Sequence, residues 1–524
     1  MKNTALEVGR SVFRMTPSAW ILSVLAFLFI QAVTVFFIVL APELGLYIFL
    51  YVLLALVVVL VFRLASPQAP LWIRVLFLVV LGNFVLNYGF SNFSVGLGSA
   101  RVTVGELVLL LSLTWVAIRA WGALWIAGAS TFLLLVYALP PLVLHLPMNL
   151  AEHGITAARD ALPLLDSLFF FGGICVVAFA RNAEQWKSWR HRFLWLLLIA
   201  ALIYFPFYPF QKALLAYSPK VTGYQQAVPL VGYFATSNVL ALAGLMATIL
   251  IPDQFAWRAG NSASRWLIAV AFIVFAFAVV MMQSRATYIV AGLTMLLLAV
   301  GGHCIAARRL VVIFMAAVVG LAAIDFSGVE FEGRVGKVGL EMLSSQLESV
   351  TGEGGLESAR SGVDQRKNWT AAALSRWASS PGTIATGVGF GVALTNFSVG
   401  GAGGKPVVVR EPHNSYVSVL TRTGLLGLVP WLIFHLVLLL KLWQKFRYER
   451  QKNDTREADY WLWMFMLFIS LLVTAVVQPV FESPHFAVPY FFLAGLCFGE
   501  IARANAGWPP LVKFNEVNDA KWFN

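Results

Sequence analysis

Charged residues are scarce in this chain: Asp, Glu, Lys and Arg make up 12% of its 524 residues, whereas hydrophobic residues make up 60%. Folded soluble proteins carry roughly twice that share of charge, so the composition excludes a soluble globular domain. Apolar stretches of about 18 to 25 residues recur along nearly the whole length, and a helix needs only about 20 such residues to cross a bilayer. We therefore predict an all-α polytopic membrane protein.

Cysteine is rare as well, and its positions do not favour a disulfide framework. Cys175, Cys304 and Cys497 all fall within apolar stretches, so we expect neither a disulfide network nor a zinc site. No cluster of acidic residues and histidines has the spacing of metal ligands, and we expect no metal and no other cofactor. The basic N-terminal segment is followed by no small-residue cleavage signal, which favours a retained first helix.

The apolar stretches predict about 12 to 14 transmembrane helices. The candidate spans are 18–40, 45–63, 71–90, 103–119, 121–143, 164–181, 191–209, 233–252, 265–283, 287–307, 309–325, 414–443, 460–480 and 486–503. Arg119 and Gly122 mark a tight turn between two of these spans, and Arg308 and Arg309 separate two short ones.

Lysine and arginine predict the orientation, because cytoplasmic loops are enriched in both. With the N-terminus in the cytoplasm, most basic loop residues fall on the cytoplasmic side: Arg181, Lys187, Arg190, Arg192, Arg258, Arg265, Arg308, Arg309, Lys441, Lys445, Arg447, Arg450, Lys452 and Arg456. These clusters account for the net charge of +12, so no nucleic-acid partner is expected. An odd number of spans precedes the long polar segment, which is therefore predicted to be periplasmic.

Three regions follow from this topology. Residues 1–325 hold the N-terminal transmembrane helices, residues 326–413 form one long periplasmic loop, and residues 414–524 hold the C-terminal transmembrane helices and a short cytoplasmic tail. Apolar residues at helical spacing predict two short amphipathic helices within the loop, in residues 334–350 and 364–380, lying on the membrane surface.

A glycine-rich stretch follows these helices, with PGTIATGVGFG and then GGAGGKP. Closely spaced glycines can turn backbone N–H groups toward an anion, but they also form plain turns, and both interpretations stay open. No strand–helix unit surrounds GVGFG, so a dinucleotide-binding fingerprint is not supported.

The densest group of polar residues, REPHNSYVSVLTRTG, begins at Arg410, where the loop re-enters the membrane. The imidazole of His413 can accept a proton from a hydroxyl near neutral pH. The alternative is a helix N-terminal residue bonded to nearby backbone. Arg410, Tyr416 and Arg422 are its close neighbours in sequence.

Arg285 lies between two apolar spans, at the predicted outer boundary of the membrane. It is either an interface anchor or a functional residue facing the bundle interior. The topology places Arg285, Arg410 and His413 in the same leaflet. Arginine binds phosphate oxygens bidentately, so this set suits a lipid-linked diphosphate, with His413 deprotonating an acceptor hydroxyl.

Other outer residues are weaker candidates for the same site. Lys220 and Arg366 are either additional phosphate ligands or ordinary solvated charges. Glu482 and His485 occupy the last outer turn, where they line the cavity or simply belong to a capped turn. No pair of carboxylates dominates an outer site. The isolated histidines, with packing or interface roles expected, are His145, His153, His303 and His435.

At this point the motifs resemble a known family. PHNSYVSVLTRTGLLGL is similar to the His-Asn, then Gly-x-x-Gly, signature of the O-antigen ligase and polymerase superfamily, and QSRATYIV resembles its Ser-Arg element. RKNWTAAALSRWASSPGTIATGVGFG resembles the stretch that precedes the family's histidine. The resemblance covers residues 283–430, and GYFATSNVLA corresponds to an upstream span that contains an asparagine, here Asn238.

The resemblance implies a membrane glycosyltransferase of the GT-C type, independent of metal and of nucleotide sugar, in a bacterial inner membrane. Its donor would be an undecaprenyl-diphosphate-linked glycan, with Arg285 and Arg410 binding diphosphate and His413 activating the acceptor. The residues expected to contact substrate are Lys220, Asn238, Arg366, Asn414, Tyr416, Arg422 and Glu482. The chain lacks the arginine that often precedes the asparagine-containing span, and Lys220 is only a distant substitute.

Several functions stay open within and beyond this family. The acceptor is a lipid A core in a ligase, a growing glycan in a polymerase, or a protein in an O-oligosaccharyltransferase. A flippase or transporter is a different class, which predicts ionisable groups at the bilayer midplane. Helix interiors here hold few charges, so glycan transfer is the favoured hypothesis. A membrane scaffold would leave the outer Arg and His residues without a purpose.

Overall fold

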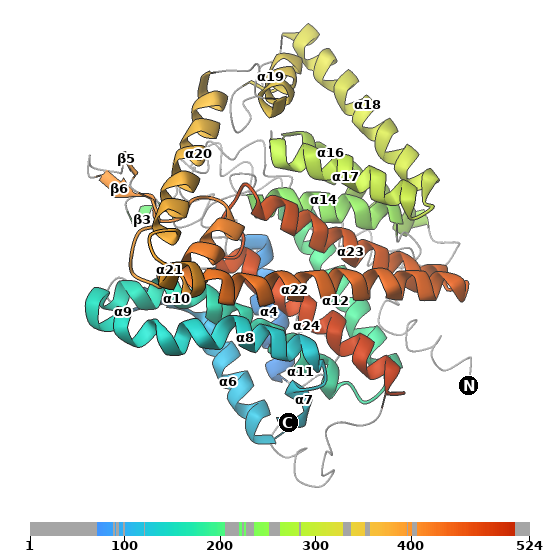
Figure 1. The fold of residues 1–524 in the computed structure, drawn as a ribbon. Coiled ribbons are helices and arrows are strands. Elements are labelled where there is room, and N and C mark those ends of the chain that lie inside the picture. The colour runs from blue at the N-terminus through green and yellow to red at the C-terminus, as the bar shows by residue number, and fades with distance from the viewer. Residues whose placement is uncertain are drawn as a thin grey trace.

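The structure is a computed structural model of the chain. It describes residues 71–86, 90, 94–97, 100–119, 121–204, 220–222, 225–226, 235–250, 262–281, 284–328, 337–351, 357–395, 397–400 and 406–508. The predicted spans 18–40 and 45–63 lie outside the described residues. The described part is a bundle of helices accompanied by three short antiparallel hairpins (Figure 1).

The N-terminal half of the described chain contributes these helices: α4 (Leu71–Leu86), α6 (Val104–Arg119), α7 (Trp121–Leu124), α8 (Ala129–Leu144), α9 (Leu146–His153), α10 (Ile155–Ser167), α11 (Phe169–Phe179), α12 (Ala183–Tyr204) and α14 (Ala235–Leu250). The C-terminal half contributes α16 (Ser262–Met281), α17 (Arg285–Val300), α18 (Cys304–Ser327), α19 (Leu340–Thr351), α20 (Glu357–Trp377), α21 (Pro381–Thr386), α22 (Ser415–Gln451), α23 (Thr455–Ala475) and α24 (Pro484–Asn505). The hairpins pair β1 (Ser94–Leu97) with β2 (Ala100–Thr103), β3 (Lys220–Thr222) with β4 (Gln225–Gln226), and β5 (Ser398–Gly400) with β6 (Pro406–Val408).

Five spans in the described residues are long and apolar enough to cross a membrane: α10 with α11, α18, α22, α23 and α24. A sixth is the pair α8 and α9, which bends by 42° at its junction. Shorter apolar helices, among them α4, α6 and α17, accompany them. The prediction of an all-α polytopic membrane protein is confirmed, whereas the count of 12 to 14 spans stays a prediction.

Two glycines bring α11 and α24 into direct backbone contact at the centre of the bundle. A Cβ on Gly173 would collide with the carbonyl oxygen of Phe492, and one on Gly495 would collide with that of Phe170. Small residues at such positions allow helices to approach closely where no hydrophobic effect drives them together in lipid. Every residue of α11 is buried, so this pair forms the inner core, whereas α18 is mostly exposed.

Two helix boundaries differ from the prediction, and glycine explains both. The turn between α17 and α18 falls at Gly301 and Gly302, where Gly302 has a φ of 76°, rather than at Arg308 and Arg309, which lie inside α18. The stretch predicted as one span over 121–143 is divided into α7 and α8 by a turn at Gly128, whose φ is 51°. Left-handed conformations cost glycine little.

The predicted periplasmic loop forms an arch beside the bundle. From α18 the chain passes through α19 and α20 and returns to the bundle at α21, as Figure 1 shows. The two predicted amphipathic helices correspond to α19 and α20, and α20 begins earlier than expected, at Glu357. A proline and a capping box at Ser380 start α21. Residues 146–163, which lie between two predicted spans, belong to α9 and α10 instead, and α10 continues into the predicted span 164–181.

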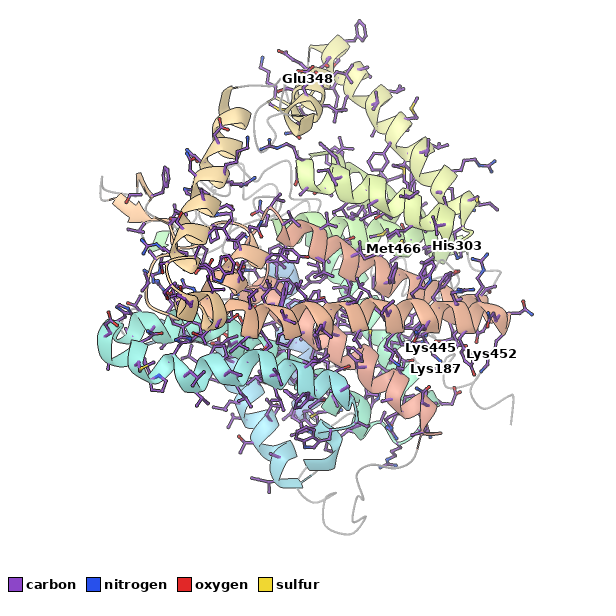
Figure 2. The ribbon with its side chains drawn as sticks, in the orientation of Figure 1. Lys187, His303, Glu348, Lys445, Lys452 and Met466 are labelled. Atoms are coloured by element: carbon purple, nitrogen blue, oxygen red, sulfur yellow. The ribbon has the colours of Figure 1, made fainter. Side chains whose placement is uncertain are left out.

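Segments predicted to be cytoplasmic are joined by polar contacts, and these contacts lie at one end of the bundle. Arg190 of α12 donates to both oxygens of Glu457 on α23, at 2.7 and 2.9 Å, and to Glu500 on α24 at 2.5 Å. Lys187 and Lys445 lie at the same end in Figure 2. Asp160, Arg410 and Glu482, predicted to be on the other side, belong to a separate group described below. The side of the membrane on which each end of the bundle lies stays a prediction.

The contact between α11 and α24 gives a first prediction. Gly173→Ala should lower the free energy of unfolding by about 1–3 kcal/mol, because the added methyl group has no space. Thermal unfolding of the purified protein in detergent measures this. Gly292→Ala on α17 is the matched control, since nothing lies within 4 Å of a Cβ at that position. Equal unfolding temperatures for the two variants would refute the close approach.

Candidate active site

The side chain of Arg422 is the centre of a polar network at the end of the bundle where the arch returns. It lies on α22 and is almost completely buried, with 6% of its side chain exposed. One terminal nitrogen donates to Glu411 Oε1 at 2.6 Å and lies 3.1 Å from Asp160 Oδ2. The other donates to the carbonyl oxygens of Gly389 and Val392, at 3.1 and 3.0 Å. One guanidinium therefore connects α10, the glycine-rich loop and the segment before α22.

Asp160 is shared between two arginines. Its carboxylate accepts from Arg410 at 2.5 Å as well as pairing with Arg422, and it also accepts from the backbone N–H of Gly391 at 3.1 Å. Arg410 in turn donates to the carbonyl of Gly391 at 2.8 Å. A buried carboxylate with three donors is held ionised, and it neutralises guanidinium charge that would otherwise be stranded.

Asp160 and Glu411 were not predicted as site residues, and the expectation that no pair of carboxylates dominates an outer site does not describe this network. Glu411 lies two residues before His413, so proximity in sequence offered a signal. Asp160 is separated from Arg410 by 250 positions, and only its place in a predicted outer segment could have drawn attention to it.

The GVGFG segment forms tight turns. Gly387, Gly389 and Gly391 have φ values of 80°, 75° and 92°. The backbone N–H groups of residues 388 to 391 all donate within the protein, to the Thr421 carbonyl, the Arg422 carbonyl, Asn149 Oδ1 and Asp160 Oδ2 respectively. Of the two interpretations left open by the sequence, this geometry supports turns, because those N–H groups are already engaged.

Two histidines, His145 between α8 and α9 and His153 on α9, contact this same loop. The Nε2 of His145 hydrogen bonds to the carbonyl of Thr386 at 2.8 Å. A Cβ on Gly391 would meet the ring of His153. His145 and His153 were expected to be isolated packing residues, and their packing partner is the glycine-rich loop of the site.

His413 occupies a strained position at the entrance to α22. Its φ is 55°, in the left-handed region that costs a non-glycine residue energy and that often marks functional sites. The Nδ1 atom lies 3.2 Å from the Glu411 carbonyl oxygen. The imidazole is tilted against the indole of Trp369 on α20, with ring centroids 4.9 Å apart. The ring is half-buried and held on two sides.

The surroundings of His413 disfavour its protonated form. Burial lowers the pKa of the imidazole to about 4, and the positive charge of Arg366 on α20 contributes to that decrease. A group with this pKa is almost entirely neutral at pH 7. Arg366, predicted as a possible phosphate ligand, is thereby placed within electrostatic range of His413.

Glu482 belongs to the same end of the bundle, in the turn between α23 and α24. Its Oε2 accepts from the Ser415 hydroxyl at 2.5 Å, while Ser418, one turn further along α22, donates to Glu411 at 3.1 Å. Burial raises the pKa of Glu482 to about 7, and the negative charge of Glu411 adds to that increase. Glu482 is therefore poised between its charged and neutral forms.

The start of α22 is shaped by Asn414, Tyr416 and Gly424, the first glycine of the Gly-x-x-Gly motif. Asn414 caps the helix by accepting from the N–H of Val417 at 3.2 Å, and Tyr416 donates to the carbonyl of Leu472 at 3.1 Å. Gly424 interrupts the helix with a φ of 64°, and a Cβ there would collide with the carbonyl of Ala385. The kink lets α21 lie directly against α22.

The remaining predicted residues are placed less completely. Arg285 is half-buried at the first position of α17, which packs against α18 and α23, and its proximity to His413 stays a prediction. Lys220 begins β3 and Asn238 lies in α14, but their side chains are outside the described part. Across the described residues, no group of three or more His, Cys, Asp or Glu side chains is arranged to hold a metal ion.

The shared carboxylate of Asp160 gives a second prediction. Asp160→Asn should lower the free energy of unfolding by about 3 kcal/mol or more, because it removes the charge that compensates two largely buried guanidinium groups. Thermal unfolding in detergent provides the measurement. Asp364→Asn serves as a control, since this exposed carboxylate pairs with Lys367 at 3.8 Å on the surface of α20 and should contribute under about 1 kcal/mol. An unchanged unfolding temperature for Asp160→Asn would contradict the network.

Comparison with known proteins identifies the part of the chain that carries this site. Residues 270–432 match the family model described as O-antigen ligase. The matched stretch begins within α16, includes Arg285, the arch and His413, and ends within α22. No curated protein matches the chain. Residues 270–432 of this multi-pass membrane protein therefore carry the similarity to the O-antigen ligase family that the order of the motifs predicted.

Proposed function

We propose that this protein transfers a glycan from an undecaprenyl-diphosphate carrier to an acceptor hydroxyl at the periplasmic face of a bacterial inner membrane, in the manner of an O-antigen ligase. The family implies an enzyme of the glycosyltransferase type in general. The observation that carries the specific proposal is the state of His413: a half-buried, neutral imidazole held at the end of the bundle where the arch re-enters.

The hydrogen bond to Glu411 selects the useful form of the ring. When Nδ1–H of His413 donates to the Glu411 carbonyl oxygen, 3.2 Å away, Nε2 carries a lone pair and can accept a proton. Trp369 fixes the ring plane from one side. The imidazole is thus prepared as a general base before any acceptor arrives.

The arginines divide into two roles in this proposal. Arg410 and Arg422 share Asp160 and the carbonyls of the glycine-rich loop, so they fix the loop that frames the site. Diphosphate binding then falls chiefly to Arg366, which already acts electrostatically on His413, and to Arg285. Guanidinium groups stabilise the negative charge that develops on a departing diphosphate.

The glycosyl transfer step needs only the donor, the acceptor and His413. The acceptor oxygen attacks the anomeric carbon of the donor, its proton passes to Nε2 of His413, and the bond from that carbon to the diphosphate oxygen breaks. The bonding electrons leave with undecaprenyl diphosphate. Polymerisation and protein O-glycosylation use the same step with a different hydroxyl, so the acceptor alone separates these alternatives from ligation to a lipid A core.

A transfer assay tests the proposal. Purified protein, supplied with a polyprenyl-diphosphate oligosaccharide and with lipid A core, glycan or protein acceptors, should form a glycosylated product without added nucleotide sugar or metal. His413→Ala should reduce the rate by about 10²–10⁴-fold, the usual contribution of a general base. His191→Ala, on α12 at the opposite end of the bundle, is the matched control. No transfer to any acceptor, together with measurable lipid flipping, would reject the enzyme in favour of a flippase.

The pH profile gives a separate prediction. Because burial and Arg366 lower the pKa of His413 to about 4, the acid limb of kcat/KM should have its midpoint near pH 4. Arg366→Gln should move this midpoint upward, toward the ordinary value of about 6.5, while burial keeps it below that value. Lys367→Gln, which removes an exposed charge next along α20, should leave the midpoint in place. A wild-type midpoint near 6.5 would show that His413 is not held neutral.

A further inference from the structure

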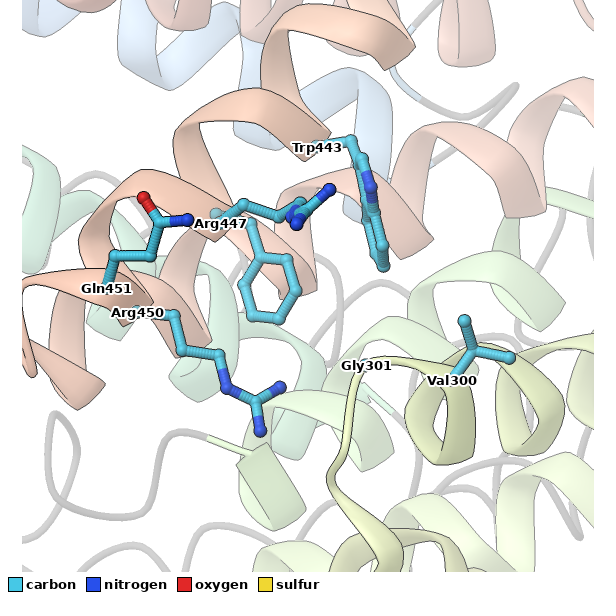
Figure 3. Close-up of a pocket in the computed structure, with 7 residues that line it drawn as sticks. Val300, Gly301, Trp443, Arg447, Arg450 and Gln451 are labelled. Carbon is cyan, nitrogen blue, oxygen red and sulfur yellow. The ribbon is translucent and has the colours of Figure 1, made fainter.

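A cavity lies at the far end of α22 from His413. Its volume is about 420 Å³, and it is open to one side between α22 and the turn that joins α17 to α18 (Figure 3). The residues that line it are Val300, Gly301, Trp443, Phe446, Arg447, Arg450 and Gln451. The glycan-transfer proposal does not use any of these residues.

Two positive charges at this cavity lack a carboxylate partner among the described residues. Arg447 and Arg450 form none of the ion pairs found there, and the nearest carboxylate on their helix, Glu449, is taken by Lys445 at 2.5 Å. The guanidinium of Arg450 reaches the α17–α18 turn, since a Cβ on Gly302 would collide with it. Figure 3 shows Arg450 extending from α22 toward this turn.

The remaining groups make the cavity amphipathic. Trp443 and Arg447 are one helical turn apart and share a face of α22, and Phe446 is buried beside them. Gln451 supplies further hydrogen-bonding groups at the rim. Guanidinium groups bind phosphate oxygens bidentately, and an indole at a membrane boundary lies beside the glycerol and upper acyl region of a lipid.

The position along α22 supports a lipid ligand. From Ser415 to Arg447 the helix rises up to about 48 Å at ~1.5 Å per residue, which exceeds the ~30 Å thickness of a bilayer's hydrocarbon core. If His413 lies at one boundary of the membrane, Arg447 and Arg450 lie at the other. Lys445 and Lys452 lie at the same end of α22 in Figure 2.

We propose that this cavity binds the phosphate headgroup of an anionic phospholipid from the leaflet opposite His413. Arg447 and Arg450 would hold the phosphate, and Trp443 and Phe446 would contact the glycerol and the first part of the acyl chains. Basic pockets between transmembrane helices on the cytoplasmic side are suited to such headgroups. This binding is independent of glycan transfer.

Native mass spectrometry of the full chain in detergent tests the site. With phosphatidylglycerol and phosphatidylcholine of identical acyl chains, we expect at least a tenfold preference for the anionic lipid. Arg447→Gln with Arg450→Gln should reduce that preference about tenfold. Lys441→Gln with Lys452→Gln is the charge-matched control, because it removes two positive charges from the same end of α22 without touching the cavity lining.

Each other outcome overturns the proposal. Equal losses in the two double variants would mean that general positive charge, rather than the cavity, attracts the lipid. Unchanged preference in Arg447→Gln with Arg450→Gln would place the lipid elsewhere. Soluble glycerol phosphate that raises the unfolding temperature as much as phosphatidylglycerol does would assign the cavity to a free phosphate compound. His413→Ala should retain lipid binding, which separates this test from that of glycan transfer.

Discussion

The buried guanidinium of Arg422 constrains the whole site. A charge with 6% of its side chain exposed is stable only if ionised partners and hydrogen-bond acceptors surround it. Those partners come from three separate parts of the chain: Asp160 on α10, Glu411 before α22, and the carbonyls of Gly389 and Val392. Satisfying this one side chain therefore requires α10, the glycine-rich loop and the start of α22 to meet in a single arrangement.

That arrangement reaches His413 through Glu411. The carboxylate of Glu411 is held by Arg422 and Ser418, and its carbonyl oxygen lies 3.2 Å from the imidazole Nδ1. With both ends of Glu411 fixed, the chain has to turn sharply into α22, and His413 takes the left-handed conformation. Such strain persists only where the surroundings over-determine it. The network thus accounts for the position of the His413 ring beside Trp369.

Sequence periodicity predicted the membrane class, most described spans and the two helices of the arch. These features depend on neighbours within about four residues, which a pattern reports well. Asp160 lies 250 positions from Arg410, so no local pattern could pair them. Arg410 was predicted as a phosphate ligand for the same reason. The sequence shows its charge, but it does not show that the carboxylate of Asp160 lies beside it.

The distribution of charge bears on the choice between transfer and transport. The helices α22, α23 and α24 each have a middle segment without Asp, Glu, Lys or Arg. These segments are residues 423–440, 460–475 and 486–499. Charge instead gathers at the two ends, around Arg422 and around Arg190. A carrier that moves a charged substrate places ionisable groups near the midplane, whereas a transferase needs them only at the interface where both substrates meet. In these three helices, the distribution of charge favours the proposed transfer over transport.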